Sequence, residues 1–99
     1  MSKYHSNRVG AYASKREARR AGELALMQQA GLISDLEEQV KFELVPKQEG
    51  ERAVTYTADF RYRENGHVVV EDSKGVKTQQ YVIRRKLMLW IHKIRVRET

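Results

Sequence analysis

Residues 54–77 constrain the fold most, because they hold two alternating runs joined by Asn65-Gly66. Asn-Gly is favoured in two-residue hairpin turns, where both positions adopt positive φ. The sequence therefore predicts two antiparallel strands in a defined register. Counting outward from the turn gives the pairs Glu64 with His67, Tyr62 with Val69, Phe60 with Glu71, and Asp59 with Asp72.

The predicted register places two acids, Asp59 and Asp72, directly opposite each other. Opposed residues have Cβ atoms roughly 5 Å apart, and like charges at that separation destabilise a sheet. Lys74 lies two residues beyond Asp72 and therefore on the same face. A divalent cation held between the carboxylates with Lys74 beside it would offset the repulsion. A solvated sheet face, with Lys74 pairing one acid, explains the same spacing, and spacing alone does not choose between the two.

The charge balance indicates the class of partner. The chain has 99 residues, enough for one small domain, with 19 Lys and Arg against 13 acids and a net charge of +6. Such an excess favours polyanions, nucleic acid ahead of an anionic membrane. No apolar run approaches the roughly 18 residues that span a bilayer, so we expect a cytoplasmic protein without membrane contact. The absence of cysteine excludes disulfides, thiolate metal sites and cysteine nucleophiles.

We expect residues 1–13 to form a basic flexible arm. Residues 14–99 are expected to form a single domain that begins with a helix. Ser14 and Glu17 form a capping box, and Gly31 ends the helix. Glu17 also falls on the inward stripe formed by Ala18, Ala21, Leu24 and Ala25. Its carboxylate therefore either completes the cap or points toward the hairpin acids. A basic band near the helix start is either solvated or contacts phosphates: Lys15, Arg16, Arg19 and Arg20.

The remaining elements complete an α+β pattern. Residues 39–45 alternate as a strand that ends at Pro46, and Thr78 is the expected N-cap of a helix that runs to about residue 90. Ile83, Leu87 and Trp90 form its predicted inward stripe, with Gln79 and Lys86 along one edge. Residues 92–97 alternate as a last strand. The predicted order is helix, three strands, helix, strand, in a mixed sheet flanked by helices.

The hairpin acids, Lys74 and the preceding helix resemble a known family. Asp59 followed by Asp72-Ser73-Lys74 on the next strand, after a helix that carries an acid, is similar to the PD-(D/E)xK nuclease superfamily. Residues 12–95 further resemble a small, largely uncharacterised domain family of phages and prophages, thought to be related to Holliday junction resolvases. The segments that carry this resemblance are 14–18, 30–33, 56–60 and 71–75, together with Gln39. Ala58 stands where the superfamily signature has proline.

The resemblance implies a restriction-endonuclease-like core and a Mg²⁺-dependent endodeoxyribonuclease, with Mn²⁺ as a substitute ion. The implied substrate is branched or junction DNA in phage recombination or replication within the host cell. Asp59, Asp72 and the Ser73 carbonyl would hold the ion, with Glu17 reaching it through water. Lys74 would orient or deprotonate the attacking water.

Other residues would support these groups or bind the substrate. Gln39 would support the ligands, and the candidate DNA contacts are Lys15, Arg16, Arg19, Arg20, Lys77, Gln79 and Lys86. Junction cleavage requires two coordinated cuts, so a homodimer is expected for that substrate. The main alternative is a non-catalytic, basic DNA-binding accessory protein with the same fold, and a structural virion protein is a third.

Overall fold

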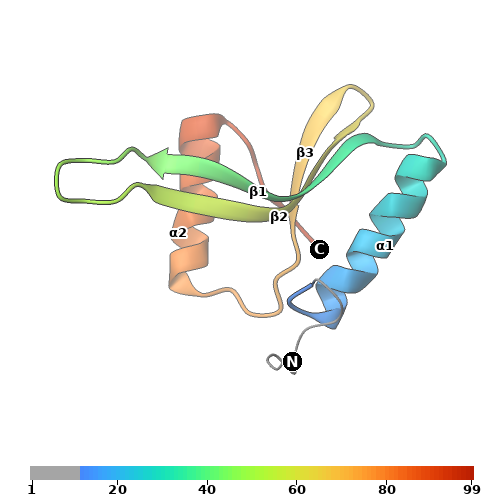
Figure 1. Ribbon diagram of the computed structural model, residues 1–99, viewed down its shortest axis with the longest axis horizontal. Helices are drawn as coiled ribbons and strands as arrows, with labels where there is room; N and C mark the ends of the chain where they lie inside the picture. The colour runs from blue at the N-terminus through green and yellow to red at the C-terminus, as the bar shows by residue number, and fades with distance from the viewer. Residues whose placement is uncertain (1–11) are drawn as a thin grey trace.

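The computed structural model describes residues 12–99 and has an α+β fold of two helices and a four-stranded mixed sheet (Figure 1). The strands lie in the order β1-β2-β3-β4, and β4 pairs parallel with β3 while the other neighbours are antiparallel. This confirms the predicted order of elements. Their bounds are α1 Lys15–Gln29, β1 Ser34–Val45, β2 Val54–Glu64, β3 His67–Asp72, α2 Gln79–Leu87 and β4 Arg97–Glu98.

Most of the predicted basic arm lies outside the described residues. Within the described part, Tyr12 packs against the cluster beside α1, and its hydroxyl donates to Glu38 at 3.1 Å. In residues 12–99, no helix has the length and apolar character to cross a membrane.

The β2–β3 hairpin has the predicted register. Phe60 pairs with Glu71, Tyr62 with Val69 and Glu64 with His67. Asn65 and Gly66 have φ values of 53° and 80°, as the turn requires. The ladder ends at the Phe60–Glu71 pair. Asp59 and Asp72 are therefore the next positions beyond it.

Local signals at both ends of α1 are confirmed. The Ser14 hydroxyl accepts a hydrogen bond from the Glu17 amide at 3.1 Å and caps the first turn. At the other end Gly31 has φ 81°, and Leu32 donates to the Met27 carbonyl at 2.9 Å. This bond closes a Schellman motif, in which a left-handed residue satisfies carbonyls of the last turn.

Strand β1 begins five residues before the predicted start at Gln39. The added residues, 34–38, include only one apolar side chain, Leu36, so hydrophobic alternation did not reveal them. Ion pairs across the sheet take its place. Arg61 donates to Glu37 at 2.7 Å, and the Arg63 guanidinium lies 3.6 Å from Asp35.

The predicted inward stripe of α2 was wrong. Tyr81 and Met88 are the buried residues of the helix and its continuation, whereas Ile83 and Trp90 are 56% and 75% exposed. The ring centroids of Tyr81 and Tyr56 lie 6.4 Å apart. The Tyr81 hydroxyl donates to Glu98 at 2.8 Å. These contacts fix the rotation of α2 about its axis, so that Ile83 and Trp90 face outward while Leu87 packs half-buried against the core.

The predicted last strand over residues 92–97 was also wrong. The helix continues through a π-helical turn, Met88–His92, and ends at Lys93, whose φ is 61°. The His92 ring Nε2 lies 2.7 Å from the Glu43 carbonyl, which fixes the ring to β1. Only two residues, Arg97 and Glu98, form β4.

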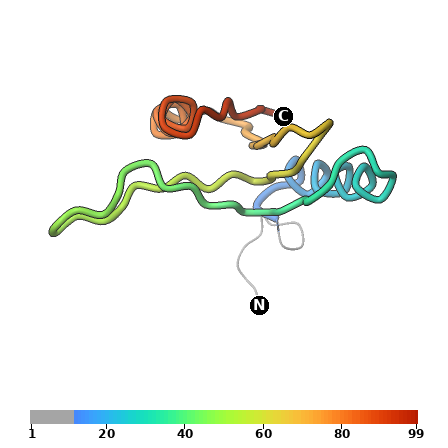
Figure 2. Tube along the Cα trace, turned by 90° about the horizontal axis from the view of Figure 1, so that it is seen from above, coloured from blue at the N-terminus to red at the C-terminus, as the bar shows by residue number. Residues whose placement is uncertain are grey.

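Two core clusters divide the sheet along its length. One lies between the sheet and α2, and the other lies beside α1; Figure 2 shows α2 lying over the long β1–β2 pair and α1 beside the end of the pair away from the β1–β2 loop. Tyr56 and Ala58 belong to the first cluster, whereas Phe60 and Tyr62 belong to the second. The division on β2 therefore falls at Asp59.

Candidate functional site

A pocket of about 520 Å³ lies between the start of α1, the middle of β1 and β2, and the segment after β3. Five residues singled out in the sequence line it, namely Glu17, Gln39, Asp59, Ser73 and Lys74. We call this the acidic pocket. Asp72 is fully buried at the end of β3, directly before Ser73. The fold thus brings together an acid of the first helix, both hairpin acids and the lysine.

Asp59 holds the chain segment that follows β3. Its Oδ2 accepts a hydrogen bond from the Ser73 amide at 2.8 Å. This side-chain bond lies just beyond the last ladder pair, where the predicted opposition of Asp59 and Asp72 would continue. It therefore fixes the Ser73 backbone next to both acids.

Asp72 has two oxygens in different surroundings. Oδ2 accepts a hydrogen bond from the Tyr56 hydroxyl. Oδ1 is buried and has no hydrogen-bond partner in the described part of the chain. The Lys74 ammonium lies 3.6 Å from this oxygen and is the nearby positive charge. A buried carboxylate oxygen without a donor is costly, and it is available to a cation.

The charge of Asp72 is poorly stabilised. Burial raises the pKa of Asp72 to about 7; the Tyr56 hydrogen bond acts against this rise, and the neighbouring Asp59 carboxylate adds to it. Burial and the bond to Asp72 also raise the pKa of Tyr56, so its hydroxyl remains a donor. The repulsion that the sequence predicted between the two acids is therefore present in the fold.

Tyr56 is a site residue that sequence reasoning did not assign. Simple alternation placed Tyr56 on the face opposite Asp72. Alternation is kept along β2, but β3 departs from it at its end, where Val70, Glu71 and Asp72 are buried in succession, and the Tyr56 hydroxyl reaches Asp72. Tyr62 makes the corresponding bond to Glu71, so each acid of the pair at the end of β3 has its own tyrosine.

Glu17 joins α1 to the sheet. Its amide is capped by Ser14, while its side-chain Oε2 accepts from the Gln39 amide nitrogen at 2.9 Å. Gln39 has φ 54° in the middle of β1, a left-handed conformation that is unusual for a residue with a side chain. Such backbone strain tends to persist at functional sites. This pair forms the wall of the acidic pocket on the side of α1.

Part of the predicted basic band lies beside the acidic pocket. Lys15, Arg16 and Arg19 are exposed on the first turns of α1. Arg16 and Arg19 line a smaller pocket of about 170 Å³, which shares Ser73 with the acidic pocket. A phosphate chain that enters the acidic pocket would pass these side chains.

Arg20 is not a free member of that band. It forms a two-point ion pair with the buried Glu71, Nε to Oε1 at 2.9 Å and Nη2 to Oε2 at 2.7 Å. Because Glu71 needs this charge in the interior, Arg20 has a structural role. Glu71 faces α1 and does not line the acidic pocket.

The remaining predicted DNA contacts do not line the acidic pocket. The Lys77 ammonium lies 3.9 Å from Glu98, and Gln79 is exposed in the first turn of α2. Lys86 lines a separate pocket at the other end of α2. The fold therefore separates these three residues from the acids.

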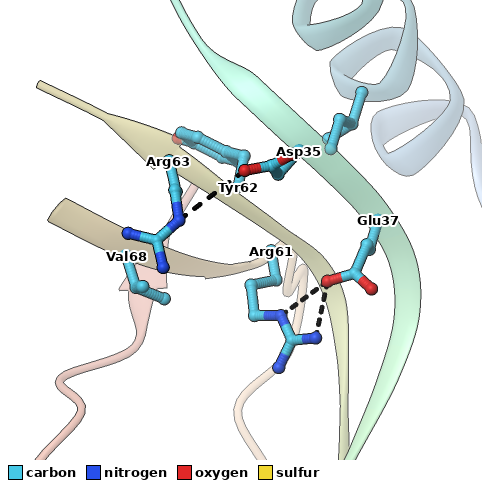
Figure 3. A pocket seen from close by; sticks show the side chains of 7 residues that line it. Asp35, Glu37, Arg61, Tyr62, Arg63 and Val68 are labelled. Carbon is cyan, nitrogen blue, oxygen red and sulfur yellow. Dashed lines mark hydrogen bonds and ion pairs between the residues drawn. The ribbon is translucent and has the colours of Figure 1, made fainter. Parts of the chain in front are cut away.

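A further pocket of about 470 Å³ lies on the paired strands β1 and β2. Figure 3 shows Arg61 and Arg63 pointing to acids of β1, Glu37 and Asp35. Each labelled charge in this pocket has a partner of opposite sign. Its chemistry differs from that of the acidic pocket, which is lined by the acids Glu17 and Asp59 and by Lys74, whose ion-pair partner is the buried Asp72.

The described residues contain no group of three or more His, Asp or Glu side chains arranged to hold a metal ion. The donors that could converge on an ion are Asp59, Asp72 and the Ser73 carbonyl. This set fits a hard cation that keeps several waters.

The comparisons place the chain in one family. Residues 1–97 match a family model described as "Protein of unknown function (DUF1064)", which covers nearly the whole chain, and the protein belongs to that family. The comparisons with curated proteins and with solved structures give no match.

Proposed function

We propose that this member of the DUF1064 family is a divalent-metal-dependent endonuclease that hydrolyses phosphodiester bonds in DNA. The observation that carries the proposal is the buried Oδ1 of Asp72, which has no hydrogen-bond donor within residues 12–99 and lies 3.6 Å from the Lys74 ammonium. Asp59 and Lys74 line the acidic pocket, and the buried Asp72 directly precedes Ser73 of its lining, so the two acids and the lysine that this chemistry requires lie close together.

The donor set suits Mg²⁺ or Mn²⁺. Both ions prefer oxygen ligands, and Mg²⁺ is usually held by one or two carboxylates with water completing its shell. Asp59, Asp72 and the Ser73 carbonyl would hold the ion, and Glu17 would bind one of its waters. The positive charge would offset the repulsion that raises the pKa of Asp72. A bound ion of this kind polarises a phosphate and lowers the pKa of a coordinated water.

The residues of the chain supply the remaining functions. Lys74 lines the acidic pocket, and its ammonium can stabilise the charge that develops on a phosphate or orient the attacking water. Tyr56 holds Asp72 in a fixed orientation through its hydroxyl. Gln39 does the same for Glu17 at 2.9 Å. Lys15, Arg16 and Arg19 would contact the phosphates on either side of the scissile bond.

Cleavage assays test the proposal. The substrates are junction, flap and duplex DNA with Mg²⁺ or Mn²⁺; branched DNA comes first because of the resemblance to junction resolvases. Asp72→Asn and Lys74→Ala are expected to lower the cleavage rate at least about 100-fold, since each removes a group that acts on charge in the transition state. Asp35→Asn is the matched control, because Asp35 is an exposed acid outside the acidic pocket. A wild-type protein that cuts nothing, or variants that cut as fast as wild type, would refute the catalytic assignment.

A second candidate is a basic DNA-binding accessory protein that does not cleave. The net charge of +6 and the exposed basic side chains Lys15, Arg16 and Arg19 support it. It predicts salt-dependent DNA binding that neither needs Mg²⁺ nor changes in Asp72→Asn. Calorimetry with Mg²⁺ distinguishes the two candidate functions. The nuclease must bind Mg²⁺ with a measurable heat that Asp72→Asn abolishes, whereas the accessory protein need not bind Mg²⁺.

A further inference from the structure

The C-terminal part of the chain carries an exposed apolar and basic surface away from the acidic pocket. Trp90 is 75% exposed, and Leu89 on the same π-helical turn is 38% exposed. Lys93 places its ammonium 5.4 Å from the centroid of the Trp90 ring. Lys86, Leu89 and Arg95 line a pocket of about 420 Å³, together with the Arg85–Glu98 ion pair. We call Lys86, Leu89, Trp90, Lys93 and Arg95 the Trp90 surface.

The charge of this region indicates what the surface binds. Residues 76–97 contain no acid and seven basic side chains, namely Lys77, Arg84, Arg85, Lys86, Lys93, Arg95 and Arg97. Arg85 pairs with Glu98 at 2.7 Å. Lys86 and Arg95 have no carboxylate within ion-pair distance in the described range 12–99. Free cations beside an exposed aromatic ring fit a partner that has both negative charge and flat apolar groups.

A second copy of the chain fits this surface poorly. A two-fold interface places the same patch against itself, and here it would bring Lys86, Lys93 and Arg95 of both copies together without acids to balance them. Single-stranded DNA satisfies both requirements, because its phosphates pair with the cations and its unpaired bases stack on an aromatic ring.

We infer that the Trp90 surface binds single-stranded DNA, with a base stacked on Trp90 and phosphates at Lys86, Lys93 and Arg95. The surface lies at the end of α2 remote from the loop that follows β3, about 18 Å along the helix at 1.5 Å per residue. The inference goes beyond the proposed nuclease, since this surface needs neither the acidic pocket nor a divalent cation. In a branched substrate it would hold an unpaired arm.

The chain has a single tryptophan, so its fluorescence reports this surface alone. We expect an oligothymidylate added in EDTA to quench Trp90 emission, because a stacked base changes the ring's environment. Inorganic polyphosphate, which has phosphates but no bases, should quench far less, and so should a duplex of equal length. Asp72→Asn should behave as wild type in this assay, so failure of the nuclease proposal and failure of this inference are distinguishable.

Binding of a labelled oligothymidylate, followed by anisotropy, gives a second readout. Trp90→Ala should weaken it about tenfold, in line with the loss of one base–aromatic stack. Lys86→Ala combined with Arg95→Ala should reduce the slope of log affinity against log salt by about 1.4, because two single-strand phosphate contacts are lost. Leu26→Ala, another exposed apolar side chain but on α1, is the matched control and should change neither.

Four results would overturn the inference. They are binding without quenching, equal quenching by polyphosphate, a blue shift of the emission with anionic phospholipid vesicles but not with the oligonucleotide, and a blue shift of the protein alone as its concentration rises. The third would assign the surface to membranes and the fourth to a second copy.

Discussion

Two acids adjacent in sequence, Glu71 and Asp72, meet opposite electrostatic conditions at the end of β3. Both are fully buried, and each accepts a hydrogen bond from a tyrosine of β2. Burial raises the pKa of Glu71, but Arg20 and Tyr62 outweigh it, and the net pKa lies below its usual value. Asp72 instead faces another acid, Asp59, and its pKa is raised. The first acid is stabilised by its ion pair with Arg20, whereas the charge of the second is unfavourable in the fold.

The Glu71–Arg20 pair gives a prediction for stability against pH. Arg20→Met should destabilise the protein at pH 7 by about 3 kcal/mol, because it leaves a buried charge unpaired. A lowered pKa in the folded state contributes stability that is present above the unfolded value and is lost as pH falls through the folded value. The difference between Arg20→Met and wild type should therefore shrink below pH 4.5, the ordinary value for glutamate.

Urea denaturation at pH 7 and at pH 3 measures this difference. Arg63→Met is the control, because its partner Asp35 is 73% exposed and the pair is expected to contribute less than about 1 kcal/mol. An Arg20→Met variant equally destabilised at both pH values would show that the ion pair does not set the stability.

Among the helices and strands, residues typical of turns and helix caps predicted the register and the helix ends accurately, whereas hydrophobic periodicity did not predict the buried face of α2. Asn65-Gly66 determined the hairpin register, and Ser14 and Gly31 determined the ends of α1, because each signal acts through the local backbone. The rotation of α2 depends on Tyr81, whose ring packs on Tyr56 of another element. Periodicity within one helix holds no information about such a contact.

The acidic pocket shows the same contrast. Register predicted the neighbouring positions of Asp59, Asp72 and Lys74, and the helical stripe predicted Glu17. Tyr56 escaped prediction because β3 departs from alternation at its end, where Val70, Glu71 and Asp72 are buried in succession. Gln39, on the neighbouring strand β1, has a left-handed backbone, and no sequence rule assigns that conformation to a glutamine.

Gln39 therefore gives a prediction for β1. At φ 54° a β-branched side chain is strained, whereas glycine is not. Gln39→Val should be less stable than Gln39→Gly by about 1–2 kcal/mol, since both lose the bond to Glu17 and only valine adds strain. Lys41, two residues along the same strand and exposed, should show the opposite order, because valine is favoured over glycine in an ordinary strand. Thermal unfolding of the four variants checks this, and the same order at both positions would contradict it.

Across the whole protein, charged side chains gather in two regions, the acidic pocket and the Trp90 surface. The acids Asp59, Asp72 and Glu17 gather where the α1 and α2 halves of the core meet, next to the exposed cations at the start of α1. The Trp90 surface lies at the far end of α2; its charged members are basic, and Glu98, which lines the same pocket as Lys86 and Arg95, is paired with Arg85. A net charge of +6 is thus compatible with a local site for a cation.

We expect the acidic pocket to bind a divalent cation through Asp72. Thermal unfolding of wild type and Asp72→Asn, in EDTA and then with Mn²⁺, tests it directly. Because a raised folded pKa means that ionised Asp72 opposes folding above pH 7, Asp72→Asn should be more stable than wild type in EDTA at pH 8, by about 1–3 kcal/mol. Mn²⁺ should then raise the unfolding temperature of wild type and leave that of Asp72→Asn unchanged, since only the carboxylate binds the ion. Equal Mn²⁺ shifts in both proteins, or none in wild type, would contradict the account.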